Sequence, residues 1–243
     1  MRCLGLDTSS ATLSLAVTAE GLVLAELSVD VSVARGERLV EHVASVLELA
    51  GCEFAGIEAI VVGAGPGSYT GLRIGYSVAK ALAYASGKPL YEVSSLRMLC
   101  LEQARMDVPL VPLLDARVDE IYYGLYRWTE RGLLCLRDDA VGTLDDLVGL
   151  CDGPRMIVGE GTRRFGAELL ALPKGTAFEL APGHPARPRV ASALLELEAG
   201  IATGSRPTPA DLAAVQSADG HAVLTRLEPR YLRPSEAERR QHA

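Results

Sequence analysis

The chain has 243 residues, of which 49% are hydrophobic and 23% charged, and its formal net charge is −7. These values are typical of a folded globular protein, with enough residues for one large domain or two small ones. The apolar runs fall far short of the ~20 residues of a membrane-spanning helix, and Asp7 interrupts the apolar start, so we expect neither a membrane anchor nor a signal peptide. The acidic balance disfavours independent binding of nucleic acid, because such binding depends on neutralising phosphates.

Cysteine and histidine residues indicate neither a disulfide framework nor a metal site. The five cysteines contain no CxxC pair, and the four histidines lie far apart. We therefore expect reduced thiols, a cytoplasmic protein and no bound metal.

The first half of the sequence predicts three strands joined by short turns, followed by alternating helices and strands. Residues 4–7 form a short apolar strand, residues 12–18 alternate with period two, and residues 22–29 return after Glu20-Gly21. The elements predicted after these are a helix over 36–50, a strand from Ala59, a helix over 72–85, a strand over 90–93 and a helix that reaches about Arg105.

The second half begins in the same way as the first. An apolar strand over 109–114 ends at Asp115, and aligning Asp115 on Asp7 places Ile121, Tyr123 and Leu125 on Leu13, Leu15 and Val17. This weak internal repeat predicts two related subdomains, 1–105 and 106–243. The remaining predictions are a hairpin over 128–136, a helix over 144–150, a strand over 156–158, a helix to Leu170, a loop over 173–188, a helix over 191–199 and an ordered segment over 228–232.

A glycine-rich stretch, residues 63–75, joins the strand at Ala59 to the long helix. Such a turn can present backbone N–H groups to an anion, or it can let two backbones approach closely. The stretch has no Lys-Ser or Lys-Thr of a Walker motif, Ser68 replaces the third glycine of GxGxxG, and Tyr69 replaces the serine of GxSxG. We therefore expect Ser68 to cap the helix rather than to act as a nucleophile.

The helix after this turn has two faces without large polar side chains. Residues four apart share a helix face, so one face is a stripe of small residues, and another is apolar. One face should meet the chain's own sheet, and the stripe should meet a second helix of this chain or of a partner; burial wholly within its own domain remains the alternative. The stripe consists of Gly67, Gly71, Gly75, Ala79 and Ala83, and the other face of Ile74, Val78, Ala81 and Ala85.

Carboxylates and hydroxyls follow the first strand of each half. Asp7, Thr8 and Ser9 lie at the carboxyl end of a strand, where an aspartate can orient magnesium and hydroxyls can contact phosphate. The alternative is that they satisfy backbone groups of the turn, and the sequence leaves the two readings even. In the second half, Arg117 is expected to neutralise one of the carboxylates beside it, and its bulk predicts that nucleotide binding is impaired there; these carboxylates are Asp115, Asp119 and Glu120.

Residues 65–75, Gly-Pro-Gly-Ser-Tyr-Thr-Gly-Leu-Arg-Ile-Gly, closely resemble the signature of the TsaB (YeaZ) family. The sequence departs from the family at residues 35–41, where Arg35-Gly36 stands in place of the histidine-containing helix start of many relatives. Supporting matches run the whole length: Leu6-Asp7-Thr8-Ser9, Leu114-Asp115-Ala116-Arg117, Glu120-Ile121-Tyr122, Val158-Gly159-Glu160-Gly161 and Pro229-Arg230-Tyr231-Leu232-Arg233.

The resemblance implies an α/β protein with the actin/Hsp70/sugar-kinase-like (ASKHA) fold, built of two related subdomains with mixed sheets. It also implies a cytoplasmic, non-catalytic subunit that pairs with the paralogous transferase TsaD and with the ATPase TsaE to make threonylcarbamoyladenosine in tRNA. The metal-binding HxxxH of the catalytic paralogue is missing from this sequence, which fits a non-catalytic role. No firmly bound cofactor is implied, and ATP or ADP with magnesium is expected only at the interface of the complex.

Family members pair through their first two helices, so the resemblance predicts which residues meet the partner. tRNA is expected to be reached only through the complex. Two alternatives remain open: a nucleotide-dependent ATPase or kinase that uses Asp7, and a homodimer through the same helices when the partner is scarce. The predicted interface consists of Leu39, Val43, Val46, Gly71, Leu72, Gly75, Ala79 and Ala83, and the predicted nucleotide-binding remnant of Asp7, Thr8, Ser9 and Asp115.

Overall fold

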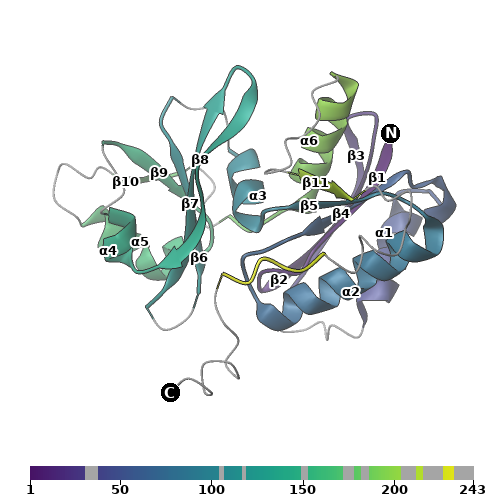
Figure 1. Cartoon of the computed structure of the whole chain (residues 1–243), viewed down its shortest axis with the longest axis horizontal. Coiled ribbons are helices and arrows are strands. Elements are labelled where there is room, and N and C mark those ends of the chain that lie inside the picture. Colours follow the sequence, from purple (N-terminus) through teal and green to yellow (C-terminus); the bar gives the residue numbers. More distant parts are fainter. Residues whose placement is uncertain are drawn as a thin grey trace. The chain divides into compact units, whose positions relative to one another are not determined.

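The computed structural model describes residues 1–30, 38–103, 107–116, 119–148, 153–171, 178–181, 186–203, 212–215 and 227–232. The chain forms two compact units, coloured along the sequence in Figure 1. Unit 1 comprises Met1–Met98 and Arg189–Arg230, and unit 2 comprises Leu99–Pro188 and Tyr231–Ala243.

Unit 1 is built on a six-stranded mixed sheet with the order β11-β5-β4-β1-β2-β3. The first three strands are antiparallel neighbours, β4 and β5 continue the sheet in parallel, and β11 closes it antiparallel to β5. The strands are β1 (Arg2–Asp7), β2 (Thr12–Ala19), β3 (Leu22–Asp30), β4 (Ala59–Gly63), β5 (Leu90–Val93) and β11 (Leu212–Val215).

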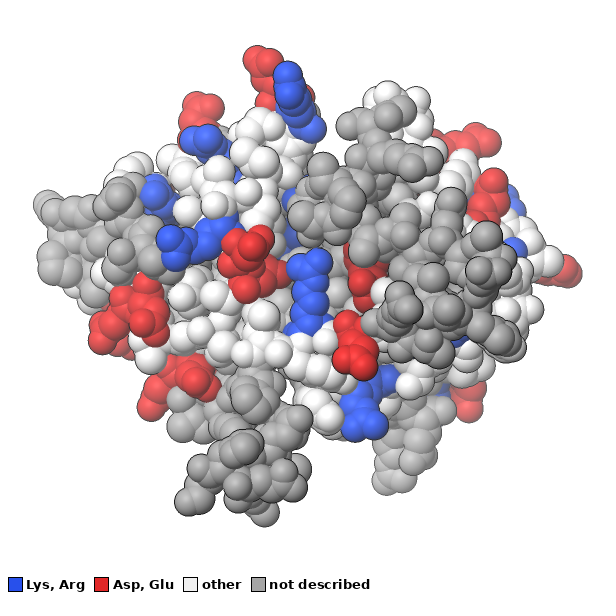
Figure 2. Space-filling model, viewed as in Figure 1, with Lys and Arg blue, Asp and Glu red and all other residues white. Residues whose placement is uncertain are grey.

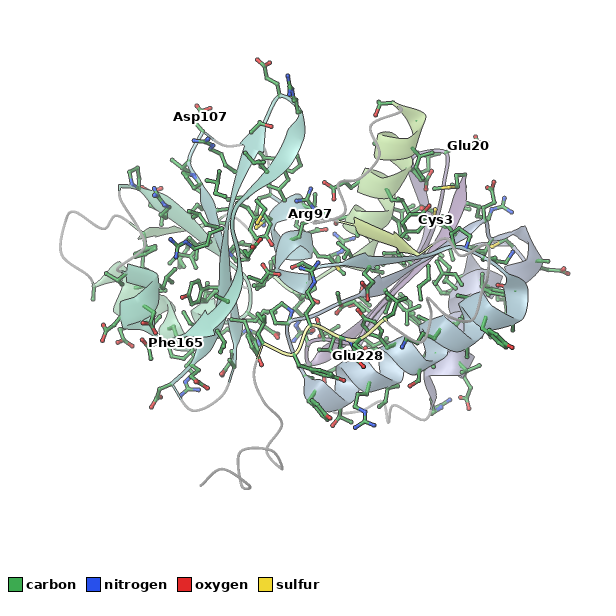
Figure 3. The ribbon with its side chains drawn as sticks, in the orientation of Figure 1. Cys3, Glu20, Arg97, Asp107, Phe165 and Glu228 are labelled. Atoms are coloured by element: carbon green, nitrogen blue, oxygen red, sulfur yellow. The ribbon has the colours of Figure 1, made fainter. Side chains whose placement is uncertain are left out.

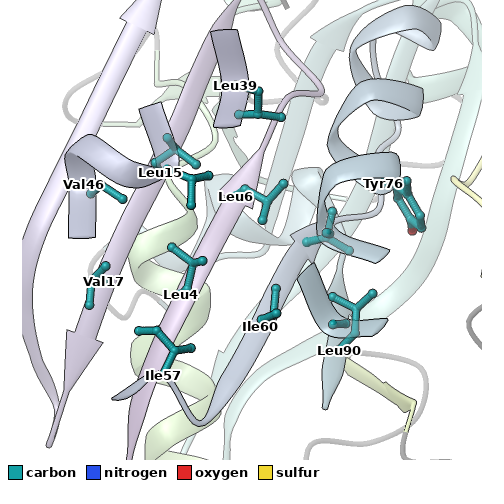
Figure 4. Close-up of a cluster of buried hydrophobic side chains, with 14 of the residues drawn as sticks. Leu4, Leu6, Leu15, Val17, Leu39, Val46, Ile57, Ile60, Tyr76 and Leu90 are labelled. Atoms are coloured by element: carbon teal, nitrogen blue, oxygen red, sulfur yellow. The ribbon is translucent and has the colours of Figure 1, made fainter. Parts of the chain in front are cut away.

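Helices cover both faces of this sheet. On one face, α1 (Leu39–Leu49) and α2 (Tyr69–Ser86) pack on the apolar side chains of β1 and β2, and Figure 4 shows Leu39, Val46 and Tyr76 in this core. On the other face, Gly5 of β1 has no side chain, which leaves room for Val190 and Leu194 of α6 (Val190–Ala202). The helix α3 (Ser95–Leu101) begins in unit 1 and ends in unit 2.

Unit 2 is built on a five-stranded mixed sheet with the order β10-β9-β6-β7-β8. The elements are β6 (Leu110–Asp115), β7 (Ile121–Thr129), β8 (Gly132–Gly142), α4 (Leu144–Val148), β9 (Arg155–Val158), α5 (Thr162–Leu170) and β10 (Phe178–Leu180). Helices α4 and α5 pack on one face of the sheet, where Leu147, Phe165 and Leu169 are buried against apolar side chains of β6 and β7.

The internal repeat predicted from the sequence is confirmed by the topology. Strands β6 to β10 of unit 2 follow the same order as β1 to β5 of unit 1, because each first strand is flanked by the second and the fourth. The aligned residues also face equivalent cores: Leu13, Leu15 and Val17 lie in that of unit 1, Ile121 and Tyr123 lie in that of unit 2, and Leu125 packs against it. The predicted fold class, two related α/β subdomains with mixed sheets, is therefore confirmed.

The structure differs from the predicted subdomains 1–105 and 106–243 in where the end of the chain belongs. Arg189–Arg230 belongs to unit 1, because α6 supplies the apolar cover for the second face of its sheet. The predicted loop over 173–188 contains β10, and β11 has no counterpart among the predicted elements. Both are strands of three or four residues, too short for a period of two to be recognisable.

Helix ends account for the other differences. Helix α2 begins at Tyr69 rather than 72, because the Ser68 Oγ accepts a hydrogen bond from the Gly71 N–H at 3.2 Å and caps the helix as predicted. Helix α3 ends at Leu101, before the predicted end near Arg105, which lies outside the described residues. In the part of the chain that the structure describes, none of the helices is long and apolar enough to cross a membrane.

Candidate functional site

The glycine-rich segment is packed tightly against the turn between β1 and β2. The Ser68 N–H donates to the Ser9 carbonyl at 2.6 Å, and the Thr8 hydroxyl donates to the Gly71 carbonyl at 2.7 Å. The first turn of α2 therefore already binds an oxygen of its own chain. At this point, the N–H group of Ser68 is engaged by a carbonyl rather than offered to an external anion.

Three glycines of the small-residue stripe make this close approach possible. A Cβ added to Gly67 would collide with the Ser9 carbonyl, one added to Gly71 with the Thr8 carbonyl, and one added to Gly75 with the Thr8 hydroxyl. Each collision would be closer than real Cβ atoms ever approach. The stripe is thus a docking face for the chain's own β1–β2 turn, which is the close-approach reading of the glycines.

Asp7 lies under this turn with no solvent exposure. Its Oδ1 accepts hydrogen bonds from the Ser9 N–H at 3.0 Å and the Ser9 hydroxyl at 2.8 Å, and its Oδ2 accepts one from the Ser95 hydroxyl at 3.0 Å. Gly63 packs on the same carboxyl group, where any Cβ would collide with it. Burial raises the pKa of Asp7, and the hydrogen bonds from Ser9 and Ser95 oppose this increase.

In unit 2, the equivalent carboxylate is exposed and paired with an arginine. Arg164 Nη1 lies 3.4 Å from both oxygens of Asp115, its Nη2 lies 2.8 Å from Asp119 Oδ1, and its guanidinium stacks on Phe165 at 4.8 Å. The predicted partner of these carboxylates, Arg117, lies outside the described residues. Sequence reasoning missed Arg164, since nothing in the sequence links it to a carboxylate 49 positions away.

These residues do not fit a magnesium-bound nucleotide held by Asp7. Both Asp7 oxygens accept hydrogen bonds from hydroxyl and N–H donors of the chain, and the residue has no exposed surface. Among the described residues, no group of three or more histidines, cysteines, aspartates or glutamates is arranged to hold a metal ion. The sequence left two roles open for Asp7-Thr8-Ser9: binding of magnesium and phosphate, or hydrogen bonding to backbone groups of the turn. The structure supports the second role.

The residues predicted to meet a partner are largely buried in unit 1. Leu39, Val43, Val46, Leu72, Gly75, Ala79 and Ala83 are all buried, and Gly71 is half-buried against Thr8. These side chains face the chain's own sheet and turn, and their part in a partner interface stays a prediction. The small-residue stripe is thus buried within unit 1, but the alternative of a helix buried wholly within its own domain does not describe α2, whose opposite face is exposed.

The opposite faces of the same two helices are open to solvent. Val40 of α1 is 60% exposed and Tyr84 of α2 is 57% exposed. Of the second face predicted for α2, Ala81 and Ala85 are exposed, and Ile74 and Val78 are partly buried. The sequence showed two faces on α2, but the periodicity alone could not say which one meets the sheet. The sequence analysis expected the small residues to meet a second helix, whereas in the structure they face the chain's own sheet and β1–β2 turn.

The final described segment, residues 227–232, contacts the core of unit 1 and the glycine-rich segment. Leu227 is buried in the core of unit 1, and the Arg230 N–H donates to the Ala64 carbonyl at 2.9 Å. Glu228, labelled in Figure 3, marks the course of this segment. Burial raises the pKa of Glu92 on β5, against the hydrogen bond from the Tyr76 hydroxyl at 2.5 Å and the charge of Arg230.

Charged side chains of both signs are interspersed on the face seen in Figure 2.

The fold places the chain in a broad class. Two α/β units with the same strand order define the ASKHA architecture. A candidate N-acetylmannosamine kinase from Listeria monocytogenes shares this fold, with a TM-score of 0.50 at 14% identity. The match covers 84% of this chain and 100% of that one.

Sequence comparison places the chain within that class. Residues 30–181 match the family described as TsaD, tRNA N6-adenosine threonylcarbamoyltransferase. The tRNA threonylcarbamoyladenosine biosynthesis protein TsaB of Bacillus subtilis (strain 168) is 32% identical over 98% of this chain and 96% of its own. A Pseudomonas aeruginosa structure, described as an uncharacterized protein with similarity to peptidase YeaZ, is 25% identical with a TM-score of 0.73, covering 96% of this chain and 99% of that one. The chain belongs to the TsaB (YeaZ) family.

Proposed function

We propose that this chain is a subunit of the cytoplasmic machinery that makes threonylcarbamoyladenosine in tRNA, where it supports a TsaD-type transferase without being catalytic itself. The family membership supports the pathway, since the Bacillus subtilis relative is named as a biosynthesis protein for this nucleoside. A TsaE-type ATPase is the further partner of this proposal, and tRNA is reached through the complex.

The observation that carries the non-catalytic role is the state of Asp7. An aspartate at this place could orient magnesium only if its oxygens were accessible, and here they are buried and hydrogen-bonded by Ser9 and Ser95. An ATPase or kinase that uses Asp7 is therefore disfavoured. In this proposal, ATP or ADP with magnesium binds at the interface of the complex rather than on this carboxylate.

The outward face of α1 and α2 is the proposed surface for the transferase. It exposes Val40, Tyr69, Ala81, Tyr84 and Ala85, and apolar or aromatic side chains grouped on a surface mark interaction sites. Aromatic residues at such sites commonly contribute 2 kcal/mol or more to binding, on the order of 30-fold in affinity. The same face would serve a homodimer when the transferase is scarce.

Reconstituted threonylcarbamoyl transfer to tRNA tests the proposal. We expect activity when this chain, the TsaD-type partner and the TsaE-type ATPase are combined, and none with this chain alone. Modification of tRNA by this chain alone, or ATP turnover by this chain that Asp7→Asn abolishes, would contradict the non-catalytic role. Full activity in its absence would contradict an essential accessory role.

The surface is tested separately with matched variants. Tyr84→Glu should weaken binding of the TsaD-type partner by about tenfold or more, because it places a charge in an apolar contact. Leu170→Glu is the control, since Leu170 is similarly exposed but lies on α5 of unit 2. Gly75→Leu is unsuitable, because Gly75 packs on Thr8 and the variant would disrupt folding. Equal binding by both glutamate variants would contradict the assignment of the surface.

A further inference from the structure

Three arginines of unit 2, which we call the arginine face, lie on its sheet without a carboxylate partner. They are Arg127 on β7, Arg137 on β8 and Arg155 on β9. Within the described part of the chain none of the three forms an ion pair, whereas Arg164 of the same unit does. In a chain with a net charge of −7, three such arginines in one place call for an explanation.

The strand register places the three arginines on the same face of the sheet. Arg137 lies directly opposite Leu125, which packs against the core of unit 2, and Arg127 follows Leu125 by two positions. On β9, Arg155 precedes Ile157 of that core by two positions. Because alternate residues of a strand face the same side, all three arginines face the side on which α4 and α5 pack.

The arginine face is open to solvent. Arg127 and Arg137 are exposed, and Leu134, directly opposite Arg127, is 48% exposed. Figure 1 shows the β7–β8 hairpin extending past α4 and α5. Arg155 is partly buried, and its Nη1 donates to the Pro154 carbonyl at 2.9 Å. The guanidinium groups of Arg127 and Arg137 are therefore accessible to a ligand.

Carboxylates of β8 are engaged by side chains of the opposite face. The Tyr126 hydroxyl donates to Asp139 Oδ1 at 2.6 Å, and Tyr126, next to Arg127 on β7, faces the other side of the sheet. Cys135, directly opposite Tyr126, has its Sγ 3.9 Å from Asp138 Oδ1. The hairpin thus separates its charges, and the arginine face is locally positive on an acidic chain.

The arrangement of these arginines suits a row of phosphates. Arginine presents a planar fork of donors that matches the oxygens of a phosphate. Neighbouring strands lie about 4.8 Å apart, so Arg127 and Arg155, two strands apart, are separated by about 10 Å along the sheet. A nucleic-acid strand carries one phosphate per nucleotide, so a single molecule can neutralise several arginines at once.

We propose that the arginine face binds the phosphate backbone of tRNA while the complex holds that tRNA. The inference rests on the proposed function, which supplies tRNA as the polyanion of the same machinery. Contacts to phosphate position an RNA without reading its sequence. The net charge of −7 keeps binding by this chain alone weak, so the contact acts together with those of the other subunits.

Steady-state kinetics of the reconstituted complex test this contact. Arg127→Gln combined with Arg137→Gln should raise KM for tRNA by about fivefold to twentyfold, at about two- to fivefold for each exposed charge pair. The value of kcat should stay unchanged, because phosphate contacts made equally before and during the reaction affect binding only. When tRNA binding to the complex is measured at several salt concentrations, the slope of log K against log salt should become shallower by about 1.5.

Two further variants separate the arginine face from charge in general. Arg163→Gln removes an exposed arginine at the start of α5, beyond the carboxyl end of β9, whereas Arg155 lies at the amino end of that strand. It should change KM for tRNA by less than about twofold. Lysine at both Arg127 and Arg137 keeps the charge and should recover most of the affinity. In all variants, co-elution with the TsaD-type partner should be unchanged.

Four results would count against the inference. If activity needs this chain but the double glutamine variant has an unchanged KM and salt slope, the contact is wrong and the proposed function stands. An equal rise in KM for Arg163→Gln would mean that only net charge matters. Loss of the TsaD-type or TsaE-type protein at unchanged affinity for tRNA would show that the arginines hold an acidic protein. Full activity without this chain would overturn both the inference and the proposed function.

Discussion

At the scale of the residue, Gly71 shows how one missing side chain sets the position of a helix. A Cβ at this position would collide with the Thr8 carbonyl, which is backbone and cannot rotate away. We expect Gly71→Ala to lower the free energy of unfolding by about 1–3 kcal/mol, because overpacking outweighs the gain of about 1 kcal/mol in helix propensity. Urea unfolding monitored by circular dichroism measures the change.

Gly166 in α5 is the matched control for this substitution. It is also a buried helical glycine, but a Cβ there would meet Thr162 and Leu180 at 3.6 and 3.7 Å, which is ordinary contact. Gly166→Ala should therefore raise the free energy of unfolding by up to about 1 kcal/mol. If both alanine variants were stabilising, the close approach of α2 to the β1–β2 turn would be wrong.

The buried carboxyl group of Asp7 predicts a specific dependence of stability on pH. Its pKa is raised above 3.8 by burial, so the folded chain binds the proton more tightly than the unfolded chain. The protonated Asp7 carboxyl group therefore stabilises the folded chain. This contribution is complete below the pKa of Asp7 in the unfolded chain and is lost as pH rises through its pKa in the folded chain. The asparagine side chain of Asp7→Asn has no charge at any pH, so the variant does not lose stability in this way.

Urea unfolding of both proteins between about pH 4 and pH 8 tests this prediction. The free energy of unfolding of Asp7→Asn, relative to that of the unaltered chain, should increase as pH rises. Ser9 and Ser95 remain available to bond the amide, since hydroxyl groups can either donate or accept. A difference that decreases with rising pH would mean that the Asp7 carboxylate is stabilised, rather than opposed, by its surroundings.

At the scale of the element, α6 is fixed to the sheet by a buried glutamate. Glu198 accepts hydrogen bonds from the Thr18 hydroxyl and, at 2.9 Å, from the Gly21 N–H, so it ties the helix to the β2–β3 hairpin. Glu198→Ala should cost about 1–3 kcal/mol for each buried donor left without a partner. Glu168→Ala, on the exposed face of α5, should change stability by less than about 0.5 kcal/mol.

Cys3 supplies a second measurement of the same contact. Burial raises the pKa of the Cys3 thiol to about 12, and the nearby charge of Glu198 adds to the increase. In Glu198→Gln the thiol should titrate at lower pH, although burial keeps its pKa above the ordinary value. The ultraviolet absorbance of the thiolate across a range of pH, in a chain whose other cysteines are replaced by alanine, follows this change. An unchanged titration would mean that Glu198 carries no charge beside the thiol.

The elements themselves show what periodicity in the sequence can establish. Strands with apolar alternation and helices with clear caps were predicted near their observed bounds, because each has a local cause such as Ser68 at the start of α2. The direction in which α2 turns its faces depends on the Thr8 and Ser9 carbonyls, which are far away in the sequence. The pairing of Arg164 with Asp115 and the hydrogen bond from Ser95 to Asp7 likewise join residues that are far apart in the sequence.

At the scale of the whole molecule, unit 1 is discontinuous in the sequence. Its second face is covered by α6, whose Val190, Leu194 and Leu197 are fully buried. Burying each such side chain contributes about 1.5–3 kcal/mol, and a domain is stable by only about 5–15 kcal/mol. The fragment 1–105, which the sequence predicted as a subdomain, should therefore not fold on its own.

Two further fragments make this prediction decisive. Residues 99–188 contain the complete five-stranded sheet of unit 2 with α4 and α5, and should fold alone. Residues 1–105 joined by a flexible linker to residues 186–232 regain α6 and Leu227, and should unfold cooperatively in urea with a dispersed amide NMR spectrum. A dispersed spectrum from 1–105 alone would show that the sheet is stable with one face uncovered. The packing of α6 would then be an addition to unit 1 rather than a part of its core.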